Sequence, residues 1–127
     1  MTGFAEYDNY DGLGLAELVR NGEISASDLL DEATDRLERV NKALNAVVYK
    51  YYDEAHAAIE AGLPAGPFQG VPFLLKDLHL FMTGTVTSNG SAMLRDNVAD
   101  HDSTLVQRYK RSGLVTFGKT FEFVDIP

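Results

Sequence analysis

A lysine that ends an apolar run is the residue of this sequence whose type and position could do chemistry. The stretch GPFQGVPFLLKDL, residues 66–78, places Lys76 after the run at 71–75 and before Asp77. A lysine in this position extends to solvent, pairs with a carboxylate or is buried. Burial disfavours the ammonium form and lowers the pKa, so that a neutral amine could accept a proton from a hydroxyl nucleophile. From the residues alone, a surface role and a catalytic role for Lys76 both remain open.

The composition limits the partners that the chain could have. Its 127 residues are 45% hydrophobic and 24% charged, which is typical of one globular domain with a modest core. The formal net charge of −8 argues against nucleic acid and membrane surfaces as partners, because both bind positive faces. There is no cysteine, no secretion signal and no apolar run long enough to span a bilayer. These features predict a cytoplasmic protein without disulfides.

Helix signals dominate the first half of the chain. Asp11 and Ser25 are N-cap candidates for two helices, and the second helix continues with apolar residues at helical spacing to Val40. Residues 45–52 predict a short strand or the lead into a further helix, which ends at Gly62.

Strand and helix signals alternate in the second half. A turn-rich connection leads into a predicted strand at 71–75, and a helix opened by Asp102 or Ser103 leads into another strand at 114–117. The fold class expected is α/β, with N-terminal helices followed by strand, helix and strand in one domain over residues 1–127. Residues 1–10 are expected to be disordered.

The lysine stretch resembles the lysine segment of the amidase signature family, in which Gly-Pro-x-x-Gly-Val-Pro-apolar-x-Lys-Asp recurs. Residues 15–48, LAELVRNGEISASDLLDEATDRLERVNKALNAVV, resemble the N-terminal helical region of that family. Residues 99–120, ADHDSTLVQRYKRSGLVTFGKT, resemble the helix, glycine and strand that follow. The resemblance implies part of a mixed sheet covered by helices. Within the family, the spacing is closest to amidases and to cyclic-dimer or lactam hydrolases.

The resemblance implies amide C–N hydrolysis by a serine, a second serine in a cis peptide, and a lysine, without metal or organic cofactor. The lysine accepts and returns a proton through the middle serine, and backbone N–H groups hold the oxyanion. Carried onto this chain, Lys76 is the catalytic base and Asp77 is a neighbour that orients the strand. Four glycines would be structural: Gly66, Gly70, Gly113 and Gly118.

The family's two serines lie in a Gly- and Ser-rich signature that these residues do not include. After Thr120 the family continues with Asn, a small residue and Pro-Glu-Phe, whereas Phe121 follows here, so residues 119–127 are an atypical tail. Ser88 and Ser91 lie in the loop TSNGSAML and are expected to be turn residues. The chain by itself is therefore expected not to turn over an amide.

Two further patterns are weak. GLVTFGKT, residues 113–120, matches the phosphate-binding P-loop expression, but a helix precedes it and its middle residues indicate a strand. Asp100, His101 and Asp102 are adjacent, so their side chains are not expected to converge on one metal ion. Neither nucleotide nor metal binding is predicted.

Two hypotheses follow. In the first, the chain is the N-terminal part of an amidase-type hydrolase and contributes Lys76 to a site for a small amide substrate, completed by residues absent here. In the second, it is a catalytically inactive α/β fragment that acts as a binding or self-associating module. Unpaired sheet edges would make a homo-oligomer plausible under either hypothesis.

Overall fold

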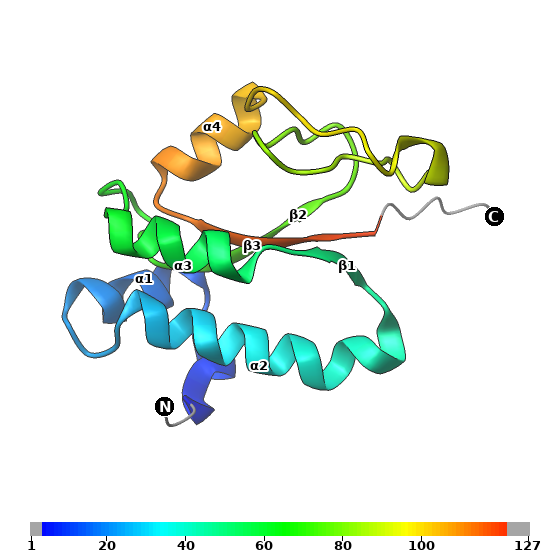
Figure 1. Cartoon of the computed structure of the whole chain (residues 1–127). Helices are drawn as coiled ribbons and strands as arrows, with labels where there is room; N and C mark the ends of the chain where they lie inside the picture. Colours follow the sequence, from blue (N-terminus) through cyan, green and yellow to red (C-terminus); the bar gives the residue numbers. More distant parts are fainter. Residues whose placement is uncertain (1–3, 122–127) are drawn as a thin grey trace.

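A three-stranded mixed sheet lies between two layers of helix and loop in the computed structural model, which describes residues 4–121 (Figure 1). The elements are η1 (Ala5–Asn9), α1 (Gly12–Arg20), α2 (Ala26–Leu44), β1 (Val47–Lys50), α3 (Tyr52–Ala61), β2 (Pro72–Lys76), η2 (Ala92–Leu94), α4 (Thr104–Arg111) and β3 (Val115–Thr120). The α/β class predicted from the sequence is confirmed. Within residues 4–121, no helix is long and apolar enough to cross a bilayer.

The strand order is β1-β3-β2, with β3 antiparallel to β1 and parallel to β2. A parallel pair of strands needs a crossover connection. The connection from β2 to β3 contains the helix α4. Both predicted strands are present, each displaced toward the C-terminus. The displacement matters because β2 ends at Lys76 and β3 extends to Thr120.

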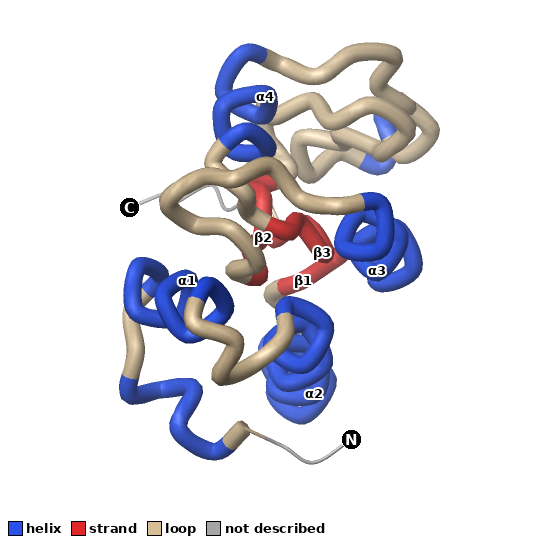
Figure 2. Tube along the Cα trace, turned by 90° about the vertical axis from the view of Figure 1, so that its left-hand side faces the viewer, coloured by secondary structure: helices blue, strands red, loops and turns tan. Residues whose placement is uncertain are grey.

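Two layers cover the sheet, as two perpendicular views show (Figures 1 and 2). We call the side that packs on α1 and α2 the helix face. The side that carries α4 and the long segment 77–103 is the loop face. On the helix face, Leu30 and Leu37 of α2 pack with Val115 and Phe117 of β3. On the loop face, a separate cluster holds Leu75, Met82 and Val106.

Polar caps fix the helix starts that the sequence predicts. The Asp11 carboxylate accepts the Gly14 N–H at 2.8 Å, and the Ser25 hydroxyl accepts the Asp28 N–H at 3.0 Å. At α4 the cap is Ser103. Asp102 instead accepts the N–H of Thr83 at 2.8 Å and pairs with Lys110 at 2.7 Å, so it ties the loop to the helix.

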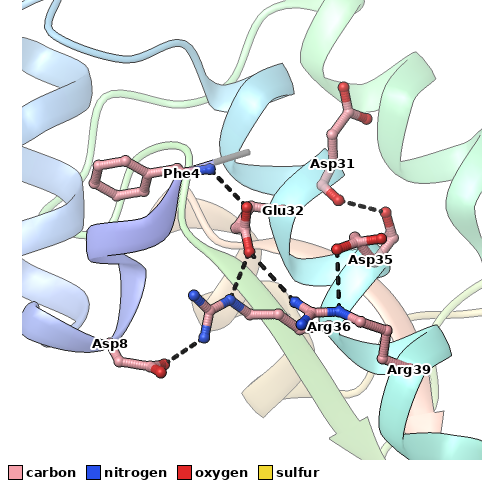
Figure 3. Close-up of polar contacts among 8 residues, drawn as sticks. Phe4, Asp8, Asp31, Glu32, Asp35, Arg36 and Arg39 are labelled. Atoms are coloured by element: carbon pink, nitrogen blue, oxygen red, sulfur yellow. Dashed lines mark hydrogen bonds and ion pairs between the residues drawn. The ribbon is translucent and has the colours of Figure 1, made fainter. Parts of the chain in front are cut away.

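Disorder is expected for residues 1–10, and of these the structure describes residues 4–10, which include η1. This short helix lies against α2 (Figure 2). The Phe4 N–H donates to Glu32 at 2.6 Å, and Asp8 pairs with Arg36 at 2.7 Å (Figure 3). Composition cannot predict these contacts, because they join residues that are distant in sequence. Residues 122–127 of the predicted atypical tail lie outside the described part.

Candidate active site

Lys76 is the last residue of β2, where it pairs with Thr120 of β3. Side chains alternate along a strand. Leu74 packs in the helix-face core and Leu75 in the loop-face cluster, so Lys76 extends from the helix face. Its side chain is exposed. Residues 4–121 therefore do not cover the Lys76 side chain.

The fully buried lysine is Lys119, which lies in the stretch that matches the P-loop expression. Its Nζ donates to the Val86 carbonyl at 2.7 Å and to the Thr87 hydroxyl at 2.9 Å. Burial lowers the pKa of Lys119 to about 8, and the negative charge of Asp77 opposes that shift. Lys119 thus ties the segment 85–91 to the sheet. Most of the stretch GLVTFGKT forms strand β3, which confirms the strand expected for its middle residues.

A β-bulge explains why Lys119 faces the loops. Thr116 pairs with Phe73 and Gly118 pairs with Leu74, so Phe117 is an extra residue in β3. If side chains alternated regularly along β3 without a bulge, Lys119 would lie on the helix face together with Val115. With it, Lys119 pairs with Leu75 and lies on the loop face. No local sequence signal marks this extra residue; only Gly118, at a close backbone approach, hints at it.

Asp77 forms the second tie between the sheet and the segment 85–91. Its buried carboxylate accepts the Ser88 N–H at 2.7 Å and the Ser88 hydroxyl. Its own N–H donates to the Thr120 carbonyl at 2.9 Å, which extends the β2–β3 ladder beyond Lys76. Asp77 therefore holds the loop at the carboxyl end of β2.

The two loop serines are engaged in local structure. Ser88 is buried against Asp77 on the loop face, whereas Lys76 extends from the opposite face. The Ser91 hydroxyl accepts the Met93 N–H at 3.3 Å and caps η2. Asn89 and Gly90 both have positive φ, as a type I′ turn requires. The structure does not bring either hydroxyl to the amine of Lys76.

The acidic residues around His101 diverge. His101 Nδ1 lies 2.9 Å from Asp100 Oδ1, while Asp102 points to Thr83 and Lys110.

The glycines expected to be structural have close neighbours. A Cβ on Gly66 would meet the Ser112 carbonyl oxygen, and one on Gly113 would meet Gln69.

Two hollows flank the end of the sheet. On the helix face, a groove of about 520 Å³ lies between α2 and the strands; we call it the helix-face groove. Its lining residues are Tyr7, Asp8, Ala33, Arg36, Leu37, Arg39, Val40, Asn41, Leu44, Ala46, Val47, Leu74, Phe117 and Thr120. On the loop face, a cavity of about 410 Å³ is lined by residues that include Tyr49, Asp77, Ser88 and Arg95. Leu74 and Thr120, the same-face neighbour and the pairing partner of Lys76, belong to the helix-face groove.

The fold and the lysine segment define an α/β unit of an amide-hydrolase family. The family profile described as Amidase matches residues 28–121. The chain belongs to the amidase signature family.

Among curated relatives, the 6-aminohexanoate-cyclic-dimer hydrolase of Paenarthrobacter ureafaciens is 39% identical over 87% of this chain and 22% of that protein. The lipoamidase of Enterococcus faecalis is 36% identical over 91% of this chain and 16% of its own length. A solved structure of 6-aminohexanoate cyclic dimer hydrolase with substrate matches at TM-score 0.82 and 36% identity, covering 92% of this chain and 24% of that one. The chain thus spans less than a quarter of these relatives.

Proposed function

We propose that this chain supplies Lys76 as the proton acceptor of an amide-hydrolysing site whose hydroxyl nucleophiles lie outside these 127 residues. The observation that carries the proposal is the exposed position of Lys76 at the end of β2, where two of its neighbours, Leu74 and Thr120, line the helix-face groove. It also lies in the stretch where the resemblance to the family is most specific. A segment that fills the groove could both bury the amine and place a hydroxyl next to it.

The proposed chemistry has two halves. A serine hydroxyl attacks the amide carbonyl while the Lys76 amine takes its proton through a second serine. The C–N bond then breaks, and the proton passes from Lys76 to the leaving nitrogen. Water attacks the resulting acyl ester, again giving its proton to Lys76, and the proton returns to the serine as the acid leaves. In each half the amine of Lys76 must be neutral when it accepts the proton and protonated when it gives the proton back, so the segment that brings the serines must also remove water from around Lys76.

The substrate class we propose is a small amide. The relatives named 6-aminohexanoate-cyclic-dimer hydrolase support a cyclic amide as the first compound to test. No charged recognition group is assigned, because a cyclic dimer of this kind presents amides without free termini.

Complementation tests the proposal. The chain is mixed with the remainder of the Paenarthrobacter hydrolase, and release of linear product from the cyclic dimer is measured. We expect hydrolysis in the mixture and not with the chain alone. Lys76→Ala should lower kcat/KM by about 10² to 10⁴-fold, the usual contribution of a positioned general base.

Lys50→Ala is the matched control, because Lys50 is also an exposed lysine that ends a strand. It pairs with Glu38 at the surface and should leave the rate nearly unchanged. A mixture with Lys76→Ala that remains as active as the unmodified mixture would exclude Lys76 as the base. Hydrolysis by the chain alone would show that the nucleophile lies within it.

A binding or self-associating module is the second candidate. The observation that favours it is the strand order, because β1 and β2 are outer strands with one edge unpaired among the described residues. Catalysis and self-association are separable experimentally.

A further inference from the structure

The chain contains two asparagines that are each followed by glycine, Asn21-Gly22 and Asn89-Gly90. In such a pair the glycine nitrogen can attack the side-chain amide carbon of the asparagine and displace ammonia. Glycine favours this attack because it has no side chain to hinder the approach and its backbone turns freely. The local sequence does not distinguish the two pairs, so the surrounding structure decides which of them reacts.

The first pair is fixed at the end of a helix. Asn21 is the C-cap of α1. The Gly22 N–H donates to Val19 O at 3.1 Å, and the Glu23 N–H donates to Leu18 O at 3.0 Å. These are the two hydrogen bonds of a Schellman motif. The nitrogen that would attack is therefore already a hydrogen-bond donor, and the helix end holds it in place.

The second pair lies in the turn of the loop-face segment 85–91. A backbone hydrogen bond from Ser91 N–H to Ser88 O, 2.9 Å long, closes this turn. The Gly90 N–H itself donates to no acceptor within residues 4–121. Gly90 is exposed, as Gly22 is, so access to water does not separate the two pairs. The difference between them is the hydrogen bonding of the attacking nitrogen.

The side chain of Asn89 also has a backbone donor at its oxygen. Asn89 Oδ1 accepts the His79 N–H at 3.3 Å. Attack on the amide carbon places negative charge on this oxygen, and a positioned N–H group stabilises such charge. The side-chain oxygen of Asn21 has no donor of this kind in the part of the chain that the structure describes.

We propose that Asn89 is a site of spontaneous deamidation, at which the folded chain converts its own asparagine to aspartate and isoaspartate. The Gly90 nitrogen bonds to Asn89 Cγ, the bond from Cγ to the amide nitrogen breaks, and ammonia leaves with the Gly90 proton. Water then opens the cyclic imide. Attack of water at Cγ gives an aspartate, whereas attack at the backbone carbonyl carbon gives an isoaspartate, in which the main chain runs through Cγ.

The modification weakens the attachment of the loop to the sheet. Ser88, the preceding residue, donates its N–H and its hydroxyl to the buried carboxylate of Asp77. A new carboxylate at position 89 places a second negative charge close to that carboxylate. Isoaspartate also lengthens the backbone within the turn. Both changes act on the tie between Asp77 and Ser88, and neither depends on the proposed function.

Peptide mapping of the full chain tests the proposal. The folded chain is incubated in mildly alkaline buffer, and digests taken over time are analysed by mass spectrometry for exchange of the amide NH₂ for OH. Fragmentation separates isoaspartate from aspartate. We expect Asn89 to react at least about tenfold faster than Asn21, because ring closure at Asn21 must first break the hydrogen bonds of the helix end. In guanidinium chloride, which unfolds the chain, the two pairs should react at similar rates.

Two substitutions form a matched pair of controls. Asn89→Gln should remove nearly all of the mass gain of the intact folded chain, whereas Asn21→Gln should leave it unchanged. Amide hydrogen exchange reports the consequence. The Ser88 N–H should exchange faster in the deamidated chain than in the fresh chain, because its acceptor Asp77 is held less firmly.

Equal rates at the two asparagines of the folded chain, or a faster reaction at Asn21, would overturn the proposal. So would an Asn89 that stays intact in the folded chain while it reacts in guanidinium chloride. Unchanged exchange at Ser88 after deamidation would overturn the loosening of the loop. The outcome of the complementation assay bears on none of these results, so this proposal and the proposed function fail separately.

Discussion

Two lysines near the ends of paired strands have opposite environments. Lys76 ends β2 and is exposed on the helix face, whereas Lys119, one position before the end of β3, is completely buried on the loop face. Lys119 has both of its hydrogen-bond partners in the segment that follows β2. The buried amine of Lys119 therefore holds the loop on the sheet, whereas the amine of Lys76 is exposed.

The buried lysine predicts how stability varies with pH. The pKa of Lys119 is lowered by burial to about 8 in the folded chain, against 10.5 for an unperturbed lysine. Between these values the unfolded chain binds more protons, so the free energy of unfolding rises with pH. Lys119→Met removes this group. We expect the unfolding free energy of the unmodified chain to gain about 2 kcal/mol relative to Lys119→Met between pH 8 and pH 10, measured by urea denaturation.

Taking the difference between the two proteins cancels the titration of the tyrosines, several of which also have raised pKa values. Lys50→Met is the control at an exposed site and should show no such gain. Parallel pH profiles for the unmodified chain and Lys119→Met would contradict the prediction.

At the scale of elements, the bulge in β3 decides which side chains reach which face. The extra residue Phe117 keeps its ring in the helix-face core and turns Lys119 toward the loops. Gly118 follows the extra residue and lies close to the backbone of β1. A Cβ at this position would lie 2.6 Å from the Tyr49 carbonyl oxygen and 3.2 Å from Leu74 and Val47 side-chain atoms. Because the nearest atom is backbone, the clash is relieved only if β1 moves.

Gly118→Ala should therefore destabilise the fold by about 1 to 3 kcal/mol, the usual cost of overpacking. Gly22→Ala is the comparison, since Gly22 has a positive φ of 74° but open space around it. Its cost should be confined to backbone strain of roughly 1 kcal/mol. Thermal or urea unfolding of both variants checks this. A Gly118→Ala protein as stable as Gly22→Ala would show that β1 adjusts freely.

At the scale of the whole molecule, net charge and unpaired strand edges have opposite effects on self-association. The net charge of −8 makes copies of the chain repel, whereas the outer strands β1 and β2 each present an unpaired edge within the described part of the chain. Self-association of the chain, if it uses these edges, must therefore overcome repulsion that salt screens.

Self-association through β1 makes a testable difference. We expect dimerisation measured by sedimentation to strengthen as salt is raised, and Val48→Asp on β1 to weaken it. Val98→Asp adds the same charge at another exposed valine, away from the sheet edges, and serves as the control. A dimer that ignores Val48→Asp, or that weakens with salt, would contradict an edge-to-edge contact.

Much of the secondary structure was predictable because its causes are local. Ser25 caps α2 through an N–H three residues away. The apolar run before Lys76 forms a strand, and the strand that pairs with it, β3, was also predicted as a strand. The contacts of Phe4 and Asp8 to Glu32 and Arg36 could not be predicted in this way, since they join residues more than twenty positions apart.

The sequence by itself determined the family, the α/β class and the position of Lys76 at a strand end, because short-range patterns and a specific motif encode all three. Only the tertiary structure decided which lysine is buried, on which face Lys76 lies and where a groove lined by two of its neighbours opens. The physical reason is that strand register and bulges arise from pairing between distant segments. One extra residue in β3 reverses the facing of every residue after it.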